Sequence, residues 1–376
     1  MPLPALSQQP LTRRACDVLN GSVAGMTAYR SGPVQITCPG CGSPLTGNRC
    51  PGCGRVLRVV QGILDLREAP PPSCWNDART VSEANLVEEL DAGHRAATTE
   101  MLVDLYVHSH RLPAELAQSS REYTLRAVER ERWNTQYMGF CMRRYAGRDL
   151  AGGFAMEAGC GSGGSLPHLA ARFEHVVGID VDMASLLIAA KRVEELGLEH
   201  KVTLIAAMLE QPVMPAEFFD FIKCTDVIEH VQDPTVAAAN LSKSLAHGGA
   251  MFVLTPNKYC FWLPEPHVRL WGVQFLPAAL ADWYVKRRIG IPYGNVARLL
   301  SYRSFRRLLL GTGLRVHSIP IEDKHLNPTS RRGQRMKRLL ALPPLAWASS
   351  IAQPVQPTLE ALCIKAPGVP EGLSTT

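Results

Sequence analysis

Four cysteines near the start of the chain have the spacing of metal ligands. They form two Cys-x-x-Cys pairs, Cys38 with Cys41 and Cys50 with Cys53, and each pair encloses a Pro-Gly dipeptide that suits a tight turn. Four thiolates in this arrangement can hold one tetrahedral Zn²⁺ ion. A redox pair or four free thiols are the alternatives, and two matched pairs with no base nearby make them less favoured. The spacing therefore predicts a structural zinc site.

A glycine-rich stretch in the middle of the chain has the composition of a nucleotide-binding turn. Residues 157–163 are Glu-Ala-Gly-Cys-Gly-Ser-Gly, between a predicted strand and a predicted helix. Glycines let the backbone approach a bulky ligand where any Cβ would clash. Asp180 ends the next predicted strand, about 20 positions further on, where an acidic side chain can bind a ribose. The stretch therefore predicts a site for a ribose-containing ligand.

Histidines and carboxylates follow two later apolar runs. Asp226, Glu229 and His230 come soon after the first of these runs, and His267 lies in the segment after the second. An imidazole titrates near neutral pH and can accept a proton from a substrate. Either histidine could instead pack or cap a helix. His230 and His267 are therefore alternative candidates for a general base.

Strands and helices alternate around these residues from position 154 onward. This alternation predicts an α/β fold, a parallel sheet with helices on both faces. The expected strands are 154–156, 176–180, 202–206, 219–224, 250–254, 314–319 and 358–365, and the expected helices are 165–172, 182–196, 234–246 and 304–310. Because parallel strands end at one edge of the sheet, the candidate residues should meet there.

The remaining sequence divides by composition into further segments. A strand-like run at 55–66 follows the second cysteine pair, and a helical pattern runs from 82 to about 147. These helices could cap the ligand or simply pack on the sheet. We expect a flexible leader (1–35), a zinc ribbon that contains the four cysteines (36–68), a Pro-rich linker (69–81) and a helical cap (82–150). The α/β core follows (151–320) and contains a lid insertion (258–302). A basic and apolar insertion, the last strand and a tail make up the remainder (321–376).

Four motifs in order resemble those of class I S-adenosylmethionine-dependent methyltransferases. They are the glycine stretch at 157–163, Gly-Ile-Asp at 178–180, Phe-Asp at 219–220 with the run at 226–234, and Leu-Thr-Pro-Asn at 254–257. The last two are similar to those of quinone-pathway and small-molecule O-methyltransferases. A dinucleotide dehydrogenase turn shares the glycine spacing, but not the two later motifs. The ribbon looks like the short zinc ribbons that accompany some RNA methyltransferases.

The resemblance implies roles for individual residues. The glycines would let the backbone approach the amino-acid end of S-adenosylmethionine, Glu157 would lie near its ammonium, and Asp180 would bind the ribose hydroxyls. The family's adenine-side acid is replaced by Ala207, so Met208 and Leu209 would hold the adenine instead. The implied cofactor-binding set is Glu157, Gly159, Gly161, Gly163, Asp180, Met208, Leu209 and Thr225.

Methyl transfer to a hydroxyl would also need a proton acceptor beside the methyl group. His267 and His230 are the two expected catalytic residues. Asp226, Glu229, His230 and His267 also resemble the metal-binding set of some RNA 2′-O- and quinone O-methyltransferases, which could hold Mg²⁺ or Zn²⁺. The metal-free mechanism is the first expectation.

The lid insertion is rich in aromatic residues and could form a wall over an acceptor pocket, although a helical subdomain with an ordinary core is the alternative. A basic and apolar run at 331–347, and a smaller basic cluster at 286–288, could meet a membrane surface or a lipid-linked acceptor. Either could equally be a solvated face. The aromatic positions are Phe261, Trp262, Trp271, Phe275, Trp283, Tyr284 and Tyr293.

The composition is that of a globular protein with mildly basic charge, since Lys+Arg exceeds Asp+Glu by 40 − 34 = 6. No stretch has the length of a membrane span, the leader lacks the core of a secretory signal, and scattered cysteines suggest a reducing compartment. We expect a cytoplasmic enzyme, with a peripheral position at a membrane as the alternative, that methylates an oxygen of a small-molecule, sugar or lipid-linked acceptor. An RNA methyltransferase that uses the weakly basic ribbon, and a non-catalytic interaction protein, are the alternatives.

Overall fold

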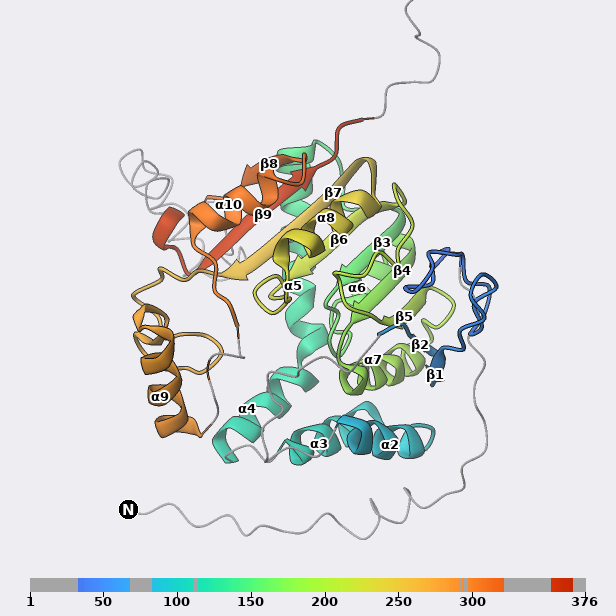
Figure 1. The fold of residues 1–376 in the computed structure, drawn as a ribbon, viewed down its shortest axis with the longest axis horizontal. Coiled ribbons are helices and arrows are strands. Elements are labelled where there is room, and N and C mark those ends of the chain that lie inside the picture. Colours follow the sequence, from blue (N-terminus) through green and yellow to red (C-terminus); the bar gives the residue numbers. More distant parts are fainter. Residues whose placement is uncertain are drawn as a thin grey trace, which may run out of the picture.

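The computed structural model describes residues 33–67, 83–110, 114–290, 293, 297–320 and 353–367. Within them lies one sheet in the order β1-β2-β5-β4-β3-β6-β7-β9-β8 (Figure 1). The strands are β1 (Arg58–Val60), β2 (Ile63–Asp65), β3 (Gly152–Ala158), β4 (Phe173–Asp180), β5 (Val202–Ala206), β6 (Phe219–Thr225), β7 (Leu245–Pro256), β8 (Arg315–Ser318) and β9 (Thr358–Ile364). The α/β class expected from the sequence is confirmed.

The centre of the sheet is parallel and its order reverses once. Strands β5, β4, β3, β6 and β7 pair in parallel, whereas β9 runs antiparallel to both β7 and β8. From β3 the chain first builds outward through β4 and β5, then returns to the other side of β3 with β6. Open α/β sheets bind ligands at the carboxyl ends of the strands beside such a reversal. The glycine stretch begins there, at the end of β3.

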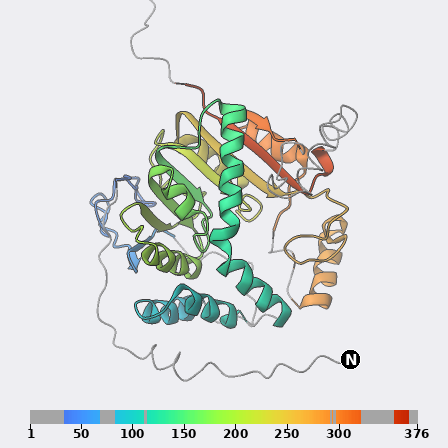
Figure 2. The ribbon, with the colours of Figure 1, turned by 180° about the vertical axis from the view of Figure 1, so that it is seen from behind.

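Helices cover both faces of the sheet because side chains alternate along each strand. Ala155 and Phe221 pack against α2, α3, α5, α6 and α7, and Figure 2 shows α5 lying across this face. Met156 and Ile222 face the opposite layer, which includes α8 and α10. The helices are α2 (Glu83–Gly93), α3 (Thr99–Ser109), α4 (Ala114–Leu125), α5 (Ala127–Cys141), α6 (Leu166–Ala170), α7 (Met183–Glu195), α8 (Pro234–Ser244), α9 (Ala278–Ile289) and α10 (Tyr302–Leu310), with shorter turns η1 (Met142–Ala146), η2 (Val273–Phe275) and η3 (Gln353–Val355).

The ribbon is part of this sheet. Its strand β2 pairs in parallel with β5, with Leu64 opposite Ile205. Ile36 and Leu64 are buried in the same apolar cluster as Met156 of β3. A segment of this size cannot enclose a core of its own. The ribbon therefore buries its apolar side chains against the sheet.

The single strand expected at 55–66 is wrong, because the structure folds this run into a hairpin. Strands β1 and β2 pair antiparallel around Gln61 and Gly62, whose φ angles are +46° and +79°. Positive φ at both central residues is typical of the tight turns that join hairpin strands. The Gln61 side chain donates a hydrogen bond to Asp91 Oδ1 at 2.5 Å, so the turn is also tied to α2.

The lid has a small core of its own, formed by Val268, Val273, Ala281 and Val285. Its helix α9 stands apart from the sheet in Figure 1. Among the residues that the structure covers, no helix is long and apolar enough to cross a membrane. Most of the leader, the Pro-rich linker and the basic run at 331–347 lie outside the described residues.

Substituting Leu64 tests whether ribbon and sheet unfold as one unit. Leu64 is 0% exposed, and truncating such a leucine to alanine costs about 2–5 kcal/mol. We expect Leu64→Ala to give one urea transition, moved to lower urea concentration, by both circular dichroism and fluorescence. The control is Val56→Ala, at a ribbon position that is 67% exposed; it should change the free energy of unfolding by less than about 0.5 kcal/mol. A sheet transition unaffected by Leu64→Ala would show that the ribbon is a separate module.

Candidate active site and four-cysteine centre

The glycine stretch forms a turn that only glycines fit. Gly159 has φ +74°, and a Cβ there would lie 2.1 Å from Val227 Cγ2. Gly163 has φ +76°, and its Cβ would lie 2.9 Å from Ala189 Cβ. Gly161 is also left-handed, with φ +48°, but a Cβ there would have no atom within 4 Å. The loop is thus packed at both ends and open at Gly161, where a ligand can approach the backbone.

Asp180 faces this loop from the end of β4. Its Oδ2 accepts a hydrogen bond from the Gly161 N–H at 2.6 Å, and its Oδ1 accepts one from the Asp182 N–H at 2.9 Å. Burial raises the pKa of Asp180 to about 6. The structure therefore places the predicted ribose-binding carboxylate against the predicted glycine turn.

Glu157 belongs to a buried charge network beneath the loop. Its Oε1 accepts hydrogen bonds from Lys223 Nζ at 2.8 Å and from Ser165 Oγ. Lys223 Nζ also donates to Glu131 Oε2 of α5 at 2.9 Å. Arg130 Nε lies 3.8 Å from Glu131 Oε1, so two cationic groups balance the two carboxylates. Burial raises the pKa of Glu157, because desolvation outweighs the attraction of Lys223.

One atom of this network has no partner. Glu157 Oε2 is buried and makes no hydrogen bond to any described residue. A buried carboxylate oxygen without a partner is costly. The unpaired oxygen suits a hydrogen-bond donor such as a ligand ammonium at this point. This is an observation in favour of the role that the resemblance implies for Glu157.

The remaining expected cofactor residues lie along the same carboxyl edge. Thr225 ends β6, and Met208 and Leu209 follow β5. Leu209 is buried and Met208 half-buried. The Met208 N–H donates to Gln211 Oε1 at 3.1 Å, which fixes the turn after β5. The Ala207 N–H donates to the Asp180 carbonyl at 3.0 Å, so this turn begins beside the end of β4.

A second cluster forms where the lid meets the end of β7. His267 Nδ1 lies 2.6 Å from Glu265 Oε1. The Nε2 atoms of His267 and His230 each lie 3.9 Å from Glu229 Oε1, and the two rings meet edge to face. Thr255 Oγ1 donates to Glu229 Oε2 at 2.9 Å, while Glu229 Oε1 is buried and makes no hydrogen bond to a described residue.

Burial and neighbouring charges shift the pKa values of this cluster. Burial and the charge of Asp226 raise the pKa of Glu229 to about 7, and burial raises that of Asp226 to about 6. Burial alone would lower the pKa of His267, but the hydrogen bond and charge of Glu265 outweigh it and raise that pKa. Groups whose pKa values approach neutrality are suited to proton transfer.

The metal set expected from the sequence is brought together only in part. Ligand atoms of Glu229, His230 and His267 all lie within 4.8 Å of one another, and Asp226 is not in this group.

The four cysteines form a second group of potential metal ligands. The Sγ atoms of Cys38 and Cys53 lie 3.8 Å apart, and those of Cys41 and Cys50 lie 3.5 Å apart. Four sulfurs this close fit one tetrahedral ion.

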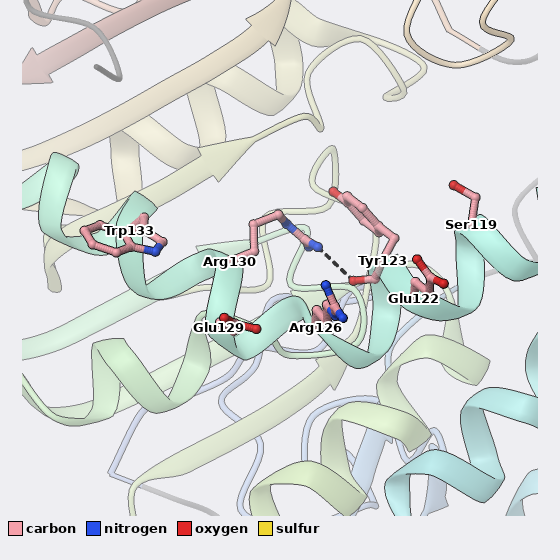
Figure 3. A pocket seen from close by; sticks show the side chains of 7 residues that line it. All are labelled: Ser119, Glu122, Tyr123, Arg126, Glu129, Arg130 and Trp133. Carbon is pink, nitrogen blue, oxygen red and sulfur yellow. Dashed lines mark hydrogen bonds between the residues drawn. The ribbon is translucent and has the colours of Figure 1, made fainter. Parts of the chain in front are cut away.

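A cavity of about 400 Å³ opens between α4 and α5 (Figure 3). The Arg130 guanidinium lies 3.6 Å from the centre of the Tyr123 ring and donates to the Tyr123 carbonyl. Arg269 of the lid reaches this cavity and donates to Ser119 Oγ at 2.9 Å. The sequence analysis did not predict this cavity. It is lined by Ser119, Glu122, Tyr123, Arg126, Glu129, Arg130 and Trp133.

Lys223 and Glu265 also escaped the sequence analysis, although each left a signal. Lys223 is a charged residue inside an otherwise apolar strand, where an unpaired charge is not tolerated. Glu265 stands two residues before His267, between two prolines. The partners of Lys223 could not be found in this way because Glu157 and Glu131 lie 66 and 92 residues away in the chain.

Curated relatives match about three tenths of the chain. "Ubiquinone biosynthesis O-methyltransferase" from Marinobacter nauticus is 34% identical over 111 residues, which are 29% of this chain and 46% of the relative. Its namesake from Pseudomonas putida is 35% identical over 109 residues, 29% of this chain and 47% of the relative. The chain spans about half the length of the curated relatives it matches.

Solved structures of methyltransferases also align with the chain. The Haemonchus contortus phosphoethanolamine N-methyltransferase 2, in complex with S-adenosyl-L-methionine, aligns with a TM-score of 0.40 at 17% identity over 62% of this chain and 53% of that one. An S-adenosylmethionine-dependent methyltransferase from Mesorhizobium loti aligns with a TM-score of 0.41 at 16% identity over 60% and 97%.

A family comparison covers half of the chain. Residues 132–319 match the family described as "Methyltransferase domain". This range contains the glycine turn, Asp180 and both candidate histidines. The chain therefore belongs to the methyltransferase-domain family.

Proposed function

We propose that this chain transfers a methyl group from S-adenosylmethionine to an oxygen of its acceptor. The observation that carries the proposal is the open glycine turn with Asp180 hydrogen-bonded to it at the sheet's reversal point. The relatives are ubiquinone biosynthesis O-methyltransferases, which supports oxygen as the methylated atom. When bound, the cofactor's sulfonium supplies an activated methyl group for in-line displacement.

Different residues at the carboxyl edge would bind different parts of the cofactor. Asp180 would accept hydrogen bonds from the ribose hydroxyls, the backbone at Gly161 would lie against the amino-acid end, and Glu157 Oε2 would accept from the ammonium. Met208 and Leu209 would pack on the adenine. Charge-assisted hydrogen bonds contribute about 1.5–3 kcal/mol each, so Asp180 should dominate the affinity.

His267 is the residue that we propose takes the acceptor's proton. Glu265 holds its Nδ1 at 2.6 Å, which leaves Nε2 as the free acceptor atom. Glu229 Oε1, at 3.9 Å from Nε2, would stabilise the imidazolium that forms. His230 would then be a neighbour of the base. The pair of Glu265 and His267 thus has the arrangement of an oriented general base.

A divalent ion is the competing role for the same side chains. Glu229, His230 and His267 offer three ligand atoms within 4.8 Å, and a bound ion could hold the acceptor's hydroxyl. His267 cannot ligate an ion through Nε2 and also accept a proton there. The two mechanisms are therefore exclusive and can be separated by experiment. A structural zinc at the four cysteines is a separate part of the proposal.

The surface of the lid supports an acceptor that lies in or on a lipid membrane. Its core is made of small aliphatic side chains, whereas Phe261, Trp271 and Trp283 are 62%, 61% and 66% exposed. Exposed aromatic clusters of this kind mark interaction surfaces. On α9 the exposed Leu280 and Trp283 share a face that leads to the exposed basic residues 286–288. Aromatic and basic side chains together suit the interface of an anionic bilayer.

Asp180→Asn tests the cofactor site. The variant keeps the shape of the side chain but loses its charge, so affinity for S-adenosylhomocysteine should fall at least about tenfold. Because the pKa of Asp180 is about 6, the wild-type carboxylate is ionised above that pH and protonated below it. Affinity should therefore weaken between pH 7.5 and pH 5.5, measured by calorimetry. Glu174→Gln, at an exposed position of the same strand, should bind normally; equal binding by both variants would remove the proposed role.

EDTA treatment distinguishes the general-base mechanism from the metal mechanism. If His267 is a base, His267→Gln should lower transfer of labelled methyl by about 10²–10⁴-fold with unchanged affinity for S-adenosylhomocysteine. EDTA that leaves the ribbon's ion in place should then have no effect on the wild type. Loss of transfer on EDTA treatment, restored by Mg²⁺ or Zn²⁺, would establish the metal mechanism instead.

Vesicle binding tests the lid surface. The full chain should bind vesicles that contain phosphatidylglycerol more tightly than pure phosphatidylcholine vesicles, and should place methyl label in the lipid fraction of a lysate. Each basic residue near an anionic surface contributes about 1 kcal/mol, so alanine at all three positions 286–288 should weaken binding by about 100-fold. Trp283→Ser should weaken it too, whereas Trp133→Ser, at an exposed tryptophan of α5, should not. Equal binding by all variants would exclude this surface.

A further inference from the structure

The loop after β5 is held in place by the ribbon. This loop, residues 207–213, carries the two side chains that we assign to the adenine. The Thr37 N–H donates to the Val213 carbonyl at 2.9 Å, and Thr37 Oγ1 donates to the Pro212 carbonyl at 3.0 Å. Gln211 Nε2 donates to the Leu66 carbonyl at 3.2 Å. The loop is thus tied to both ends of the ribbon.

The ribbon also reaches the turn that follows Asp180. Arg67 donates to the Val181 carbonyl at 2.8 Å, and its guanidinium is held by Asp65 and Glu83 at 2.8 and 2.5 Å. Its side chain is only 8% exposed, so it acts as a fixed buried contact. Arg67 therefore links the end of the ribbon hairpin to the residue next to the ribose-binding carboxylate.

These contacts depend on how firmly the ribbon itself is folded. Strand β2 pairs with β5, but β1 and β2 have only three residues each, too few to fix the cysteine-bearing loops by themselves. Cys38, next to Thr37, and Cys50 are each 1% exposed, and both belong to the apolar cluster that includes Leu64. A structural zinc ion contributes its binding free energy directly to the folding of such a unit. The four-cysteine centre is therefore placed to hold Thr37 in position, whereas the Leu66 N–H is bonded to the Ala206 carbonyl of β5 at 2.8 Å.

We propose that the four-cysteine centre controls the affinity of the chain for the adenosine end of its cofactor. With the ion bound, Thr37 and Gln211 hold the 207–213 loop against the adenine while Arg67 fixes the turn beyond Asp180. Without it, the Thr37 contacts loosen, the 207–213 loop is held at one end only, and the adenosine pocket opens. Thr37, Gln211 and Arg67 are positioning residues, since each acts through another residue. This inference rests on the proposed cofactor site.

The coupling between zinc and cofactor can be measured without enzymatic turnover, because coupling between two binding sites is reciprocal. If the ion strengthens cofactor binding by some factor, the cofactor must strengthen ion retention by the same factor. We expect zinc transfer from the full chain to a chromogenic chelator to slow when S-adenosylhomocysteine is present. Removal of the zinc should weaken calorimetric affinity at least tenfold for both S-adenosylhomocysteine and 5′-methylthioadenosine, because the second probe contains the adenosine end alone.

A pair of threonine variants keeps the test valid if the zinc-free chain unfolds. Thr37→Val removes the hydrogen bond to Pro212 and should weaken 5′-methylthioadenosine binding about fivefold with zinc still bound. Thr46→Val makes the same change at an exposed ribbon position and should leave affinity unchanged. Identical affinities for these variants, or zinc transfer that ignores the cofactor, would overturn the inference. A zinc-loaded wild type that binds neither probe would instead overturn the proposed function.

Discussion

The sharing of one buried ammonium by two carboxylates is the interaction on which the rest of the site depends. Lys223 lies in the central part of the sheet and is 3% exposed. Its Nζ joins Glu157 at the end of β3 to Glu131 of α5, at 2.8 and 2.9 Å. Removing one partner of such a buried group typically costs about 3–5 kcal/mol. The network therefore fixes α5 to the sheet beside the glycine turn and leaves Glu157 Oε2 without a hydrogen bond among the described residues.

Local motifs were enough to locate most of the proposed cofactor site. The glycine turn, Asp180 and the cysteine pairs were recognisable because each has its function within a few neighbouring residues, and the parallel sheet then brings the turn and Asp180 to one edge. The hairpin at 55–66 was missed because its turn begins with Gln61, whereas such turns usually begin with Asn, Asp or Gly. The charge network was out of reach because its members are distant in sequence and only the packing of α5 on the sheet joins them.

The two additions to the sheet act at opposite ends of the proposed cofactor. The ribbon extends the sheet beyond β5 and contacts the loop and the turn around the adenosine end. The lid leaves the sheet after β7 and brings His267 to Glu229 near the acceptor end. The carboxyl edge of the sheet lies between them, so each addition can affect one half of the ligand with little effect on the other.

The separate core of the lid has an evolutionary consequence. Because Val268, Val273, Ala281 and Val285 pack on one another, the segment can change its outer surface without disturbing the sheet. The same segment carries Glu265 and His267. Replacing it as a cassette would exchange the surface that meets the acceptor together with the residue proposed to take the acceptor's proton. Divergence toward new acceptors could therefore proceed by swapping one continuous stretch of chain while the cofactor half of the enzyme is inherited intact.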